Sequence, residues 1–409
     1  MKTFFVTLLI LTGISSTAQV SQLPPLLANG DNLITSSEKW ETSRRGQILH
    51  IFGEEVYGHI PPPPAGFHFE VTQVKENALT NGATMKEVTI WFDDSKTHPI
   101  HLLIFLPVNT TEKVPAVMGL NFKGNQSVHP HGDIMLCPTP LRNDPENGII
   151  QHTAAEASRG VRKGRFPVER ITDRGYAFVT ACYEEIDPDY DDLFKNGVHA
   201  LFPAKYKDTL KGNNTATISA WAWGLMRMMD YLAYEPAIDT SRVILFGHSR
   251  LGKAALWAGA NDERFEMVIS NNSGCGGAAL SKRKKGETVA DINKNFPHWF
   301  NQNFKKYNNA EENLPLDQHM LLALIAPRLL YVASAEDDFW ADPEGEFLAL
   351  KAAEKAFHLY GYNFSLPDKL PPVNYPLQNV ISYHIRTGPH DLKNYDWEIF
   401  LNAADKYLK

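Results

Sequence analysis

The most constraining feature of the sequence is a series of short, almost wholly apolar segments that alternate with longer amphipathic ones. The apolar segments lie at residues 114–122, 176–182, 242–246, 265–270, 328–333 and 380–385. Strands that are apolar on both faces are typical of parallel sheets, which helices cover on both sides. We therefore expect an open α/β fold with a mostly parallel central sheet and right-handed crossovers.

The segments between these strands predict helices and one hairpin. Helical spacing is clearest in residues 215–234, where Trp221, Leu225 and Met228 fall on one face. Further helices are expected at 251–260, 346–360 and 396–408. Residues 87–92 and 101–107 are separated by Asp-Asp-Ser turn residues and predict an antiparallel hairpin before the parallel strands. Residues 125–170 have little periodicity and are expected to form long loops near the site.

The first residues resemble a cleavable export signal. Lys2 precedes the apolar run 4–14, and Ser16-Thr17-Ala18 supplies small residues before Gln19. We therefore assign 1–18 to a signal peptide and expect a secreted or periplasmic protein. Residues 19–409 are expected to form a single catalytic domain. Within it, residues 19–80 form an N-terminal arm, irregular through its proline run at 61–64, that packs on the domain.

Composition excludes several classes of protein. The apolar fraction is 43%, which fits a globular core, and no stretch after the signal is long enough to span a bilayer. The net charge is −7 and the basic residues are scattered, so nucleic acid is not an expected partner. Cys137, Cys182 and Cys275 show no zinc-binding spacing; at most one pair could form a disulfide, and we expect buried thiols. We expect no cofactor, no metal and a monomer.

The strongest chemical signal is a serine placed between a strand and a helix. An apolar strand leads into Gly247-His-Ser-Arg-Leu-Gly-Lys253, and small residues follow. Such an elbow raises a nucleophilic serine, here Ser249, at the carboxyl end of a strand beside free N–H groups of a helix. The usual elbow has glycine at the position of Leu251; here the glycine comes one residue later. An ordinary helix N-cap is the alternative role for Ser249.

A serine nucleophile needs a base and an acid, which in this arrangement follow it along the chain. His390, in the loop after the last strand, is the expected base, whereas His384 lies within that strand. The acid is expected after the preceding strand, where Glu336, Asp337 and Asp338 are adjacent. Spacing alone does not choose among these three carboxylates.

The motifs resemble carbohydrate esterase family 15, the glucuronoyl esterases. Gly247-His-Ser-Arg-Leu-Gly-Lys253 is similar to the family signature G-x-S-R-x-G-K, and the resemblance continues through four further motifs and the His390 loop. These are Ser273-Gly-Cys-Gly-Gly277, Gly286-Glu-Thr288, Phe296-Pro-His-Trp-Phe300 and Trp340-Ala-Asp-Pro343. The resemblance covers about residues 80–409. It implies an α/β-hydrolase three-layer sandwich, antiparallel at its N-terminal part, and hydrolysis of esters that join 4-O-methyl-glucuronic acid of glucuronoxylan to lignin alcohols.

The resemblance also implies roles for individual residues. Ser249 is the nucleophile and His390 the base, while Arg250 stabilises the oxyanion through its backbone N–H and its guanidinium. Lys253 and Glu287 bind hydroxyl groups of the glucuronate, and Trp340 packs against the sugar. Some members, including fungal ones, carry the catalytic acid just before the S-G-x-G-G stretch, where this chain has the uncharged Asn272. The resemblance therefore implies Asp338 as the acid, with Asp337 as the alternative.

Two other functions compete with glucuronoyl ester hydrolysis. An acetylxylan esterase or general carboxylesterase needs the serine, base and acid, but not Arg250, Lys253, Glu287 and Trp340 as well. A non-catalytic carbohydrate-binding protein on the same fold needs none of the three catalytic groups. This chain has the serine, base and acid together with those four additional residues, and this combination favours the glucuronoyl esterase.

Overall fold

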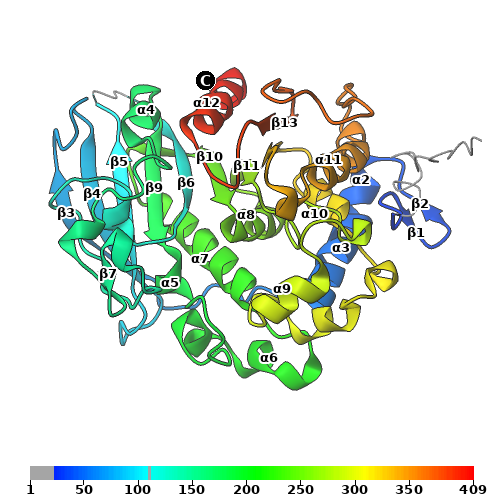
Figure 1. The fold of residues 1–409 in the computed structure, drawn as a ribbon, viewed down its shortest axis with the longest axis horizontal. Helices are drawn as coiled ribbons and strands as arrows, with labels where there is room; N and C mark the ends of the chain where they lie inside the picture. Colours follow the sequence, from blue (N-terminus) through cyan, green and yellow to red (C-terminus); the bar gives the residue numbers. More distant parts are fainter. Residues whose placement is uncertain (1–22, 109–111) are drawn as a thin grey trace, which may run out of the picture.

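The computed structural model describes residues 23–108 and 112–409, so the expected signal peptide lies outside the described residues. Its centre is a nine-stranded sheet of order β13-β12-β11-β10-β6-β9-β5-β4-β3 (Figure 1). The strands are β3 (His68–Lys75), β4 (Thr84–Trp91), β5 (Ile100–Leu106), β6 (Val114–Asn121), β9 (Ala177–Cys182), β10 (Ile238–His248), β11 (Phe265–Asn271), β12 (Leu329–Ala335) and β13 (Ile381–Arg386). Two small hairpins, β1–β2 (Ala28–Asn29 and Asn32–Leu33) and β7–β8 (Ile149–Ile150 and Thr153–Ala154), lie outside it.

The pairing of the strands follows the division that the sequence predicted. From β9 through β6, β10, β11 and β12 to β13, every neighbouring pair is parallel. The pairs β3–β4, β4–β5 and β5–β9 are antiparallel, so the predicted hairpin forms. The carboxyl ends of β10, β11, β12 and β13 therefore lie along one edge, which is where open α/β sheets carry their sites.

Helices cover both faces of the sheet, which makes a three-layer sandwich (Figure 1). In that view α4 and α12 lie above the sheet, and α7 and α8 lie below it. Ion pairs between Arg170 and Glu398 and between Arg174 and Asp405 join α4 to α12. The helices are α2 (Ser37–Lys39), α3 (Arg45–Phe52), α4 (Val168–Asp173), α5 (Tyr183–Ile186), α6 (Ala204–Lys207), α7 (Thr217–Leu232), α8 (Arg250–Asn261), α9 (Val289–Asn295), α10 (Gln318–Ala323), α11 (Pro343–His358) and α12 (Asn394–Leu408).

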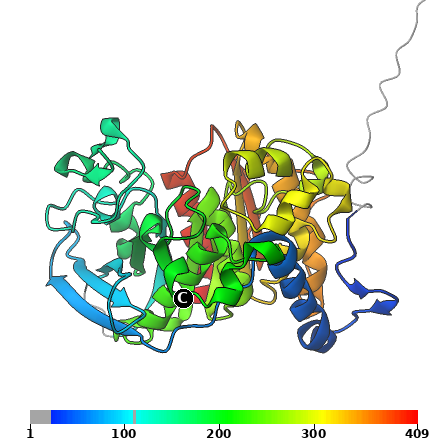
Figure 2. The same ribbon diagram turned by 90° about the horizontal axis from the view of Figure 1, so that it is seen from below.

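The N-terminal arm differs from the irregular segment that we expected. Residues 37–57 form a continuous helical run in which α2 and α3 alternate with two π-helical turns, Trp40–Arg44 and Gly53–Tyr57. Several of its apolar side chains, Trp40, Ile48 and Phe52 among them, are fully buried. This run packs beside α10 and α8 (Figures 1 and 2), and burial against the domain stabilises a helix that its local sequence does not predict.

Strand β3 was also missed by the sequence analysis. It pairs only with β4, and none of its side chains is buried, so it has no apolar run to reveal it. Residues 125–170 are mostly loop, as expected, with only short helical turns and the β7–β8 hairpin. The three cysteines are free and buried.

None of the helices in residues 23–108 and 112–409 has the length and the hydrophobicity that crossing a bilayer requires.

Candidate active site

The serine elbow is built at the junction of β10 and α8. Strand β10 ends at His248 and α8 begins at Arg250, so Ser249 is the single residue between them. Its backbone has φ 59° and ψ −130°, a conformation that a residue with a side chain rarely adopts. The N–H of Ser249 donates to the carbonyl of Asn271 at 2.9 Å, which anchors the turn to β11. The side chain is therefore presented at the carboxyl end of the central strands.

Glycines on both sides of the serine permit this turn. A Cβ atom at Gly247 would lie 2.0 Å from the carbonyl oxygen of Leu251, so any side chain there would clash with the first turn of α8. A Cβ at Gly252 would lie 3.0 Å from the Cβ of Ser273. The second glycine thus allows α8 to pack closely on the 273 loop, while Leu251 is buried in the core.

His390 and Asp338 meet at the ends of the last two strands. His390 Nδ1 lies 2.6 Å from Asp338 Oδ2; the aspartate is buried, whereas the imidazole is 41% exposed. Burial alone would raise the pKa of Asp338, but the hydrogen bond and charge of His390 and the amide of Asn272 lower it below its ordinary value. A carboxylate that stays charged can hold the Nδ1–H tautomer and leave Nε2 free to accept a proton.

The backbone decides which of the three adjacent acids reaches His390. The N–H of Glu336 donates to Arg386 and that of Asp337 to Gly388, so both residues extend the pairing of β12 with β13. The side chain of Asp337 is exposed, and only that of Asp338 turns inward to the imidazole. Buried Arg386 donates to the carbonyls of Pro389 and Asp391 at 3.0 and 2.6 Å, which fixes the histidine loop.

The other candidate histidine lies away from the serine. His384 is fully buried within β13, where its Nε2 lies 2.8 Å from Asp396 and its Nδ1 lies 3.0 Å from the hydroxyl of Tyr331. Asp396 also accepts from Arg386 at 2.9 Å. These contacts give His384 a structural role beneath the loop that carries His390.

Asn272, the residue at the alternative acid position, touches the acid. Its side-chain amide donates to Asp338 Oδ2 at 2.8 Å, so the two candidate acid positions are neighbours in space. The amide favours the charged form of Asp338. Sequence reasoning identified Asn272 only as a missing acid, because its contact with Asp338 spans 66 positions of the chain.

Two cavities open on the serine and the histidine, and both are lined by Ser249, Arg250 and His390. The first, of about 250 Å³, also contains Lys253, Glu287 and Trp340, and we name it the tryptophan cavity. The second, of about 220 Å³, contains Lys123, Arg142, Arg162 and Arg165, and we name it the basic cavity. The structure therefore gathers every sequence-predicted site residue around the tryptophan cavity.

Arg250 is held rigidly beside the serine. Its guanidinium forms an ion pair with buried Asp189 and stacks 4.7 Å from the ring centre of Trp299. Burial would raise the pKa of Asp189, but hydrogen bonds from His298 and Trp299 and the charge of Arg250 lower it to about 2. Arg250 Nε is buried and has no partner among residues 23–108 and 112–409. As the first residue of α8, Arg250 also has a backbone N–H that the helix does not use.

The tryptophan cavity pairs a cation with an anion under an exposed aromatic ring. Buried Lys253 donates to the carbonyls of Ser273 and Cys275, the latter at 2.6 Å, which leaves one of its three N–H groups for a ligand. Burial lowers the pKa of Lys253, although Glu287 opposes this shift. The N–H of Glu287 donates to the carbonyl of Trp340 at 2.9 Å, which joins the backbones of these two residues. Trp340 itself is 54% exposed and available for stacking.

A fully buried glutamate lies behind the 273 loop. Glu346 accepts hydrogen bonds from Ser334 Oγ at 2.6 Å and from the N–H of Gly274 at 2.9 Å. Burial nevertheless raises its pKa to about 8. The folded protein thus holds this proton more tightly than the unfolded chain does. Its stabilising contribution is complete below the ordinary glutamate pKa and is lost as the pH rises through about 8.

We therefore expect Glu346→Gln to reduce the pH dependence of stability. Between about pH 5 and pH 9 the thermal midpoint of the unaltered protein should fall more than that of the variant, since glutamine has no proton to lose. Thermal unfolding over this pH range measures the difference. Exposed Glu38→Gln is the matched control and should leave the pH profile unchanged. Equal slopes for the Glu346 variant and the unaltered protein would mean that Glu346 is ionised in the fold.

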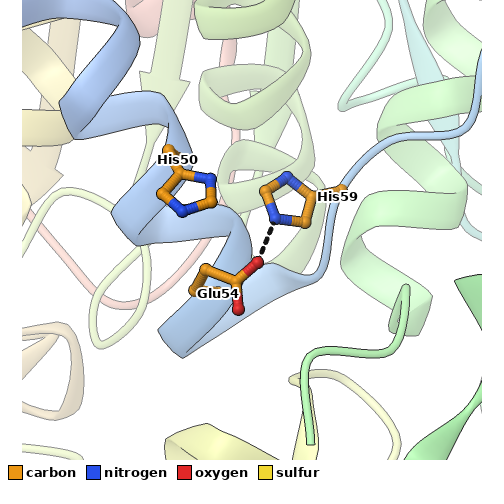
Figure 3. Close-up of side chains that lie close together, drawn as sticks. All are labelled: His50, Glu54 and His59. Atoms are coloured by element: carbon orange, nitrogen blue, oxygen red, sulfur yellow. Dashed lines mark hydrogen bonds and ion pairs between the residues drawn. The ribbon is translucent and has the colours of Figure 1, made fainter. Parts of the chain in front are cut away.

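A separate group of possible metal ligands lies on the N-terminal helical run. Figure 3 shows His50 and Glu54 on this run facing His59 on the following loop. His59 Nε2 lies 2.6 Å from Glu54 Oε1, and both oxygens of Glu54 also accept from the side-chain amide of Asn213 at 2.9–3.0 Å. The rings of His50 and His59 stack with their centres 5.3 Å apart. Hydrogen bonds and stacking thus already account for this cluster.

Two further partners in the site were not predicted from sequence. Asp189 holds Arg250, and His248 packs its ring 4.7 Å from the ring of His390. His248 Nδ1 lies 2.6 Å from Asn271 Oδ1. Burial and the nearby His390 hold the pKa of His248 well below its usual value, so a neutral ring lies against the proposed base. The position of His248 within the elbow was its only sequence signal, and Asp189 had none.

Comparison with known proteins gives the same family as the motifs. A family model described as fungal glucuronyl esterase matches residues 201–361. Carbohydrate esterase MZ0003, from an unknown prokaryotic organism, is 41% identical over 94% of this chain and 89% of its own length. A 4-O-methyl-glucuronoyl methylesterase of Podospora anserina is 34% identical over 85% of this chain and 73% of its own. The solved glucuronoyl esterase from Solibacter usitatus is 42% identical, with a TM-score of 0.89 over 95% of this chain and 98% of that one. This chain is therefore a member of carbohydrate esterase family 15 and a carboxylic ester hydrolase.

Proposed function

We propose that this protein hydrolyses the ester between 4-O-methyl-glucuronic acid of glucuronoxylan and an alcohol of lignin. One observation carries the proposal: Ser249 and the His390–Asp338 pair line the same cavity as Lys253, Glu287 and Trp340. The first group suits acyl transfer, and the second suits a sugar acid with hydroxyl groups and an apolar face. A small acyl ester needs only the first group.

The proposed reaction passes through an acyl-enzyme. Ser249 Oγ attacks the ester carbonyl while His390 Nε2 takes the hydroxyl proton, and Asp338 stabilises the imidazolium that forms. The tetrahedral oxyanion accepts hydrogen bonds from the backbone N–H and the guanidinium of Arg250. His390 then gives its proton to the departing alcohol. Water, activated by the same histidine, attacks the acyl-enzyme, releases the uronic acid and restores the Ser249 hydroxyl.

Replacement of Arg250 should act mainly on kcat. The oxyanion exists only in the transition state and the intermediate, so Arg250→Ala should lower kcat by about 10²–10³-fold with a smaller change in KM. Steady-state kinetics on a glucuronate ester measures both constants. Because this variant also leaves Asp189 unpaired in the interior, Arg250→Ala/Asp189→Asn separates catalysis from folding. A pure KM effect would instead give Arg250 a role in ground-state binding.

Replacement of the sugar-facing residues should change specificity. We expect alanine variants of Lys253, Glu287 and Trp340 to lose activity on glucuronate esters far more than on small acyl esters, because only the former reach these side chains. The ratio of kcat/KM for the two substrates is the measurement. Phe339→Ala removes the neighbouring ring, which is also exposed, and should keep the ratio. Equal losses on both substrates would mean that the three residues support the fold or the triad.

Turnover of benzyl glucuronate against benzyl acetate tests the proposed function directly. A kcat/KM that strongly favours the glucuronate supports the glucuronoyl esterase, and equal or greater turnover of the acetate supports a general carboxylesterase. Labelling of Ser249 by a fluorophosphonate shows an activated serine. A protein that neither turns over an ester nor reacts with this probe would be a carbohydrate-binding protein, and the proposed function would be wrong.

We also propose that the enzyme acts outside the cytoplasm, as a secreted or periplasmic monomer. The order of charged, apolar and small residues in 1–18 supports export, and a polymeric plant cell-wall substrate lies outside the cell. N-terminal sequencing of the mature protein should begin at Gln19, and a mature chain that retains Met1 would contradict export. Light scattering measures the oligomeric state.

A further inference from the structure

The basic cavity concentrates positive charge beside the nucleophile. Five cationic side chains line it together with Ser249 and His390, and no carboxylate is among its lining residues. The cations are Lys123, Arg142, Arg162, Arg165 and Arg250. The whole chain has a net charge of −7, so this concentration is not a consequence of a basic composition. A site with one sign of charge and a partly buried wall focuses its field on a ligand of the opposite sign.

Two of these arginines have no direct ion-pair partner in the described residues, although Asp144 and Asp391 attract the charge of Arg162 from a distance. Lys123 pairs with Asp144, Arg165 with Asp391 and Arg250 with Asp189. The side chains of Arg142 and Arg162, by contrast, form no ion pair or hydrogen bond within the part of the chain that the structure describes. Arg162 Nε is buried without a partner there, and burial lowers the pKa of this guanidinium. A ligand in the cavity cannot reach this buried nitrogen, but Arg162 lines the cavity, and its other guanidinium nitrogens are the donors that such a ligand would use.

The acyl half of the proposed substrate cannot supply the missing negative charge. Its only carboxyl group is the one in the ester, which is neutral until it is cleaved. The tryptophan cavity, on the Lys253 and Glu287 side of Ser249, already has groups suited to that sugar. The alcohol must leave within reach of His390, which gives it a proton, and His390 and Ser249 also line the basic cavity. The alcohol half is therefore the part that enters the basic cavity.

The size and the remaining walls of the basic cavity indicate what kind of alcohol fits. Its volume is about 220 Å³, and an engineered cavity of about 150 Å³ is enough to hold benzene. Phe122 and Tyr183 add aromatic walls beside the arginines. Planar guanidinium groups bind carboxylates through two parallel hydrogen bonds.

From these observations we propose that the basic cavity is a subsite for an alcohol that carries its own carboxylate on a ring-sized body, held by Arg142 and Arg162. This proposal rests on the proposed glucuronoyl ester hydrolysis, whose substrate it extends to esters that are anionic on the alcohol side.

Two substrates that differ only in this carboxylate group test the proposal. We expect 4-carboxybenzyl glucuronate to be hydrolysed with a kcat/KM about tenfold or more above that of benzyl glucuronate, which is the effect of one good charge-assisted contact. The ratio should fall as salt is added, because salt screens the attraction. A ratio of one or below overturns the proposal. If benzyl glucuronate itself is not hydrolysed, the failure lies with the proposed function.

Variants of the two unpaired arginines locate the effect. Arg142→Gln, at an exposed position, and Arg162→Gln should each reduce the ratio severalfold. Arg170→Gln, on α4, should keep it, because Arg170 pairs with Glu398 of α12 away from the cavity. If Arg162→Gln fails to fold, Arg162→Lys keeps the charge without the planar fork and should give an intermediate ratio. A ratio that none of the Arg142 and Arg162 variants changes overturns the assignment of this subsite.

Direct binding separates the subsite from catalysis. Calorimetric titration of 4-(hydroxymethyl)benzoate into the Ser249→Ala protein should show binding. The affinity should be severalfold lower in the double variant Ser249→Ala/Arg142→Gln. Benzyl alcohol should bind at least tenfold more weakly than the benzoate. Free glucuronate, the other carboxylate of the reaction, is titrated in parallel. If glucuronate alone shows dependence on Arg142, the basic cavity holds the acid product instead, and the proposal is wrong.

Discussion

Replacing Ser249 by alanine is expected to abolish ester hydrolysis, and replacing His390 by alanine should lower kcat by about 10⁴-fold or more. The residues of a triad act as a unit, because the hydroxyl is a weak nucleophile until the imidazole takes its proton. The elbow supports this expectation: Ser249 has a strained backbone at the end of β10, and His390 lines both cavities that open on it. Single-turnover and steady-state kinetics on benzyl glucuronate measure the loss.

Loss of activity in these variants must be separated from loss of the fold. Both side chains lie at the surface of a cavity, so circular dichroism and thermal unfolding should show an intact fold in each variant. His98→Ala removes a half-buried histidine in the turn between β4 and β5, outside both cavities, and should keep normal kcat. Near-normal kcat in His390→Ala would show that another group is the base.

Asp338→Asn is expected to lower kcat by about 10⁴-fold, as the corresponding change does in the best-studied triad. The asparagine keeps the shape of the side chain, but it can present an N–H to Nδ1 and so favour the wrong tautomer of His390. It also removes the negative charge that stabilises the imidazolium. The structure supports the choice of this residue, since the Asp338 carboxylate is buried 2.6 Å from Nδ1 and its pKa is held low.

Asp337→Asn is the matched control, one residue away. Its carboxylate is exposed, so neutralising it should change kcat little. Measuring kcat for both variants decides between the two acids. The assignment fails if Asp337→Asn is the crippled enzyme and Asp338→Asn is nearly normal. If both changes are mild, the acid lies outside the 336–338 loop.

The fold class and the serine elbow could be predicted from sequence because both depend on local physics. Apolar strands of five to nine residues predict a covered parallel sheet wherever they occur, and the predicted strands from 87–92 to 380–385 all form. At Gly247 the constraint is steric and comes from Leu251, four residues away in the sequence. The helical run at 37–57 and strand β3 escaped prediction, since one is stabilised by burial against distant elements and the other has no buried side chain.

The sequence by itself thus determined a layered α/β fold, a serine raised between a strand and a helix, and a histidine loop after the last strand. Only the tertiary structure decided which of three adjacent carboxylates meets His390, because neighbouring side chains of a loop point in directions that the loop's distant contacts set. It also placed Asn272 against Asp338 and Asp189 against Arg250. The charge of the basic cavity arises in the same way: its cations are scattered over residues 123–250, and folding brings them around one cavity, where Arg142 and Arg162 form no ion pair with the described residues.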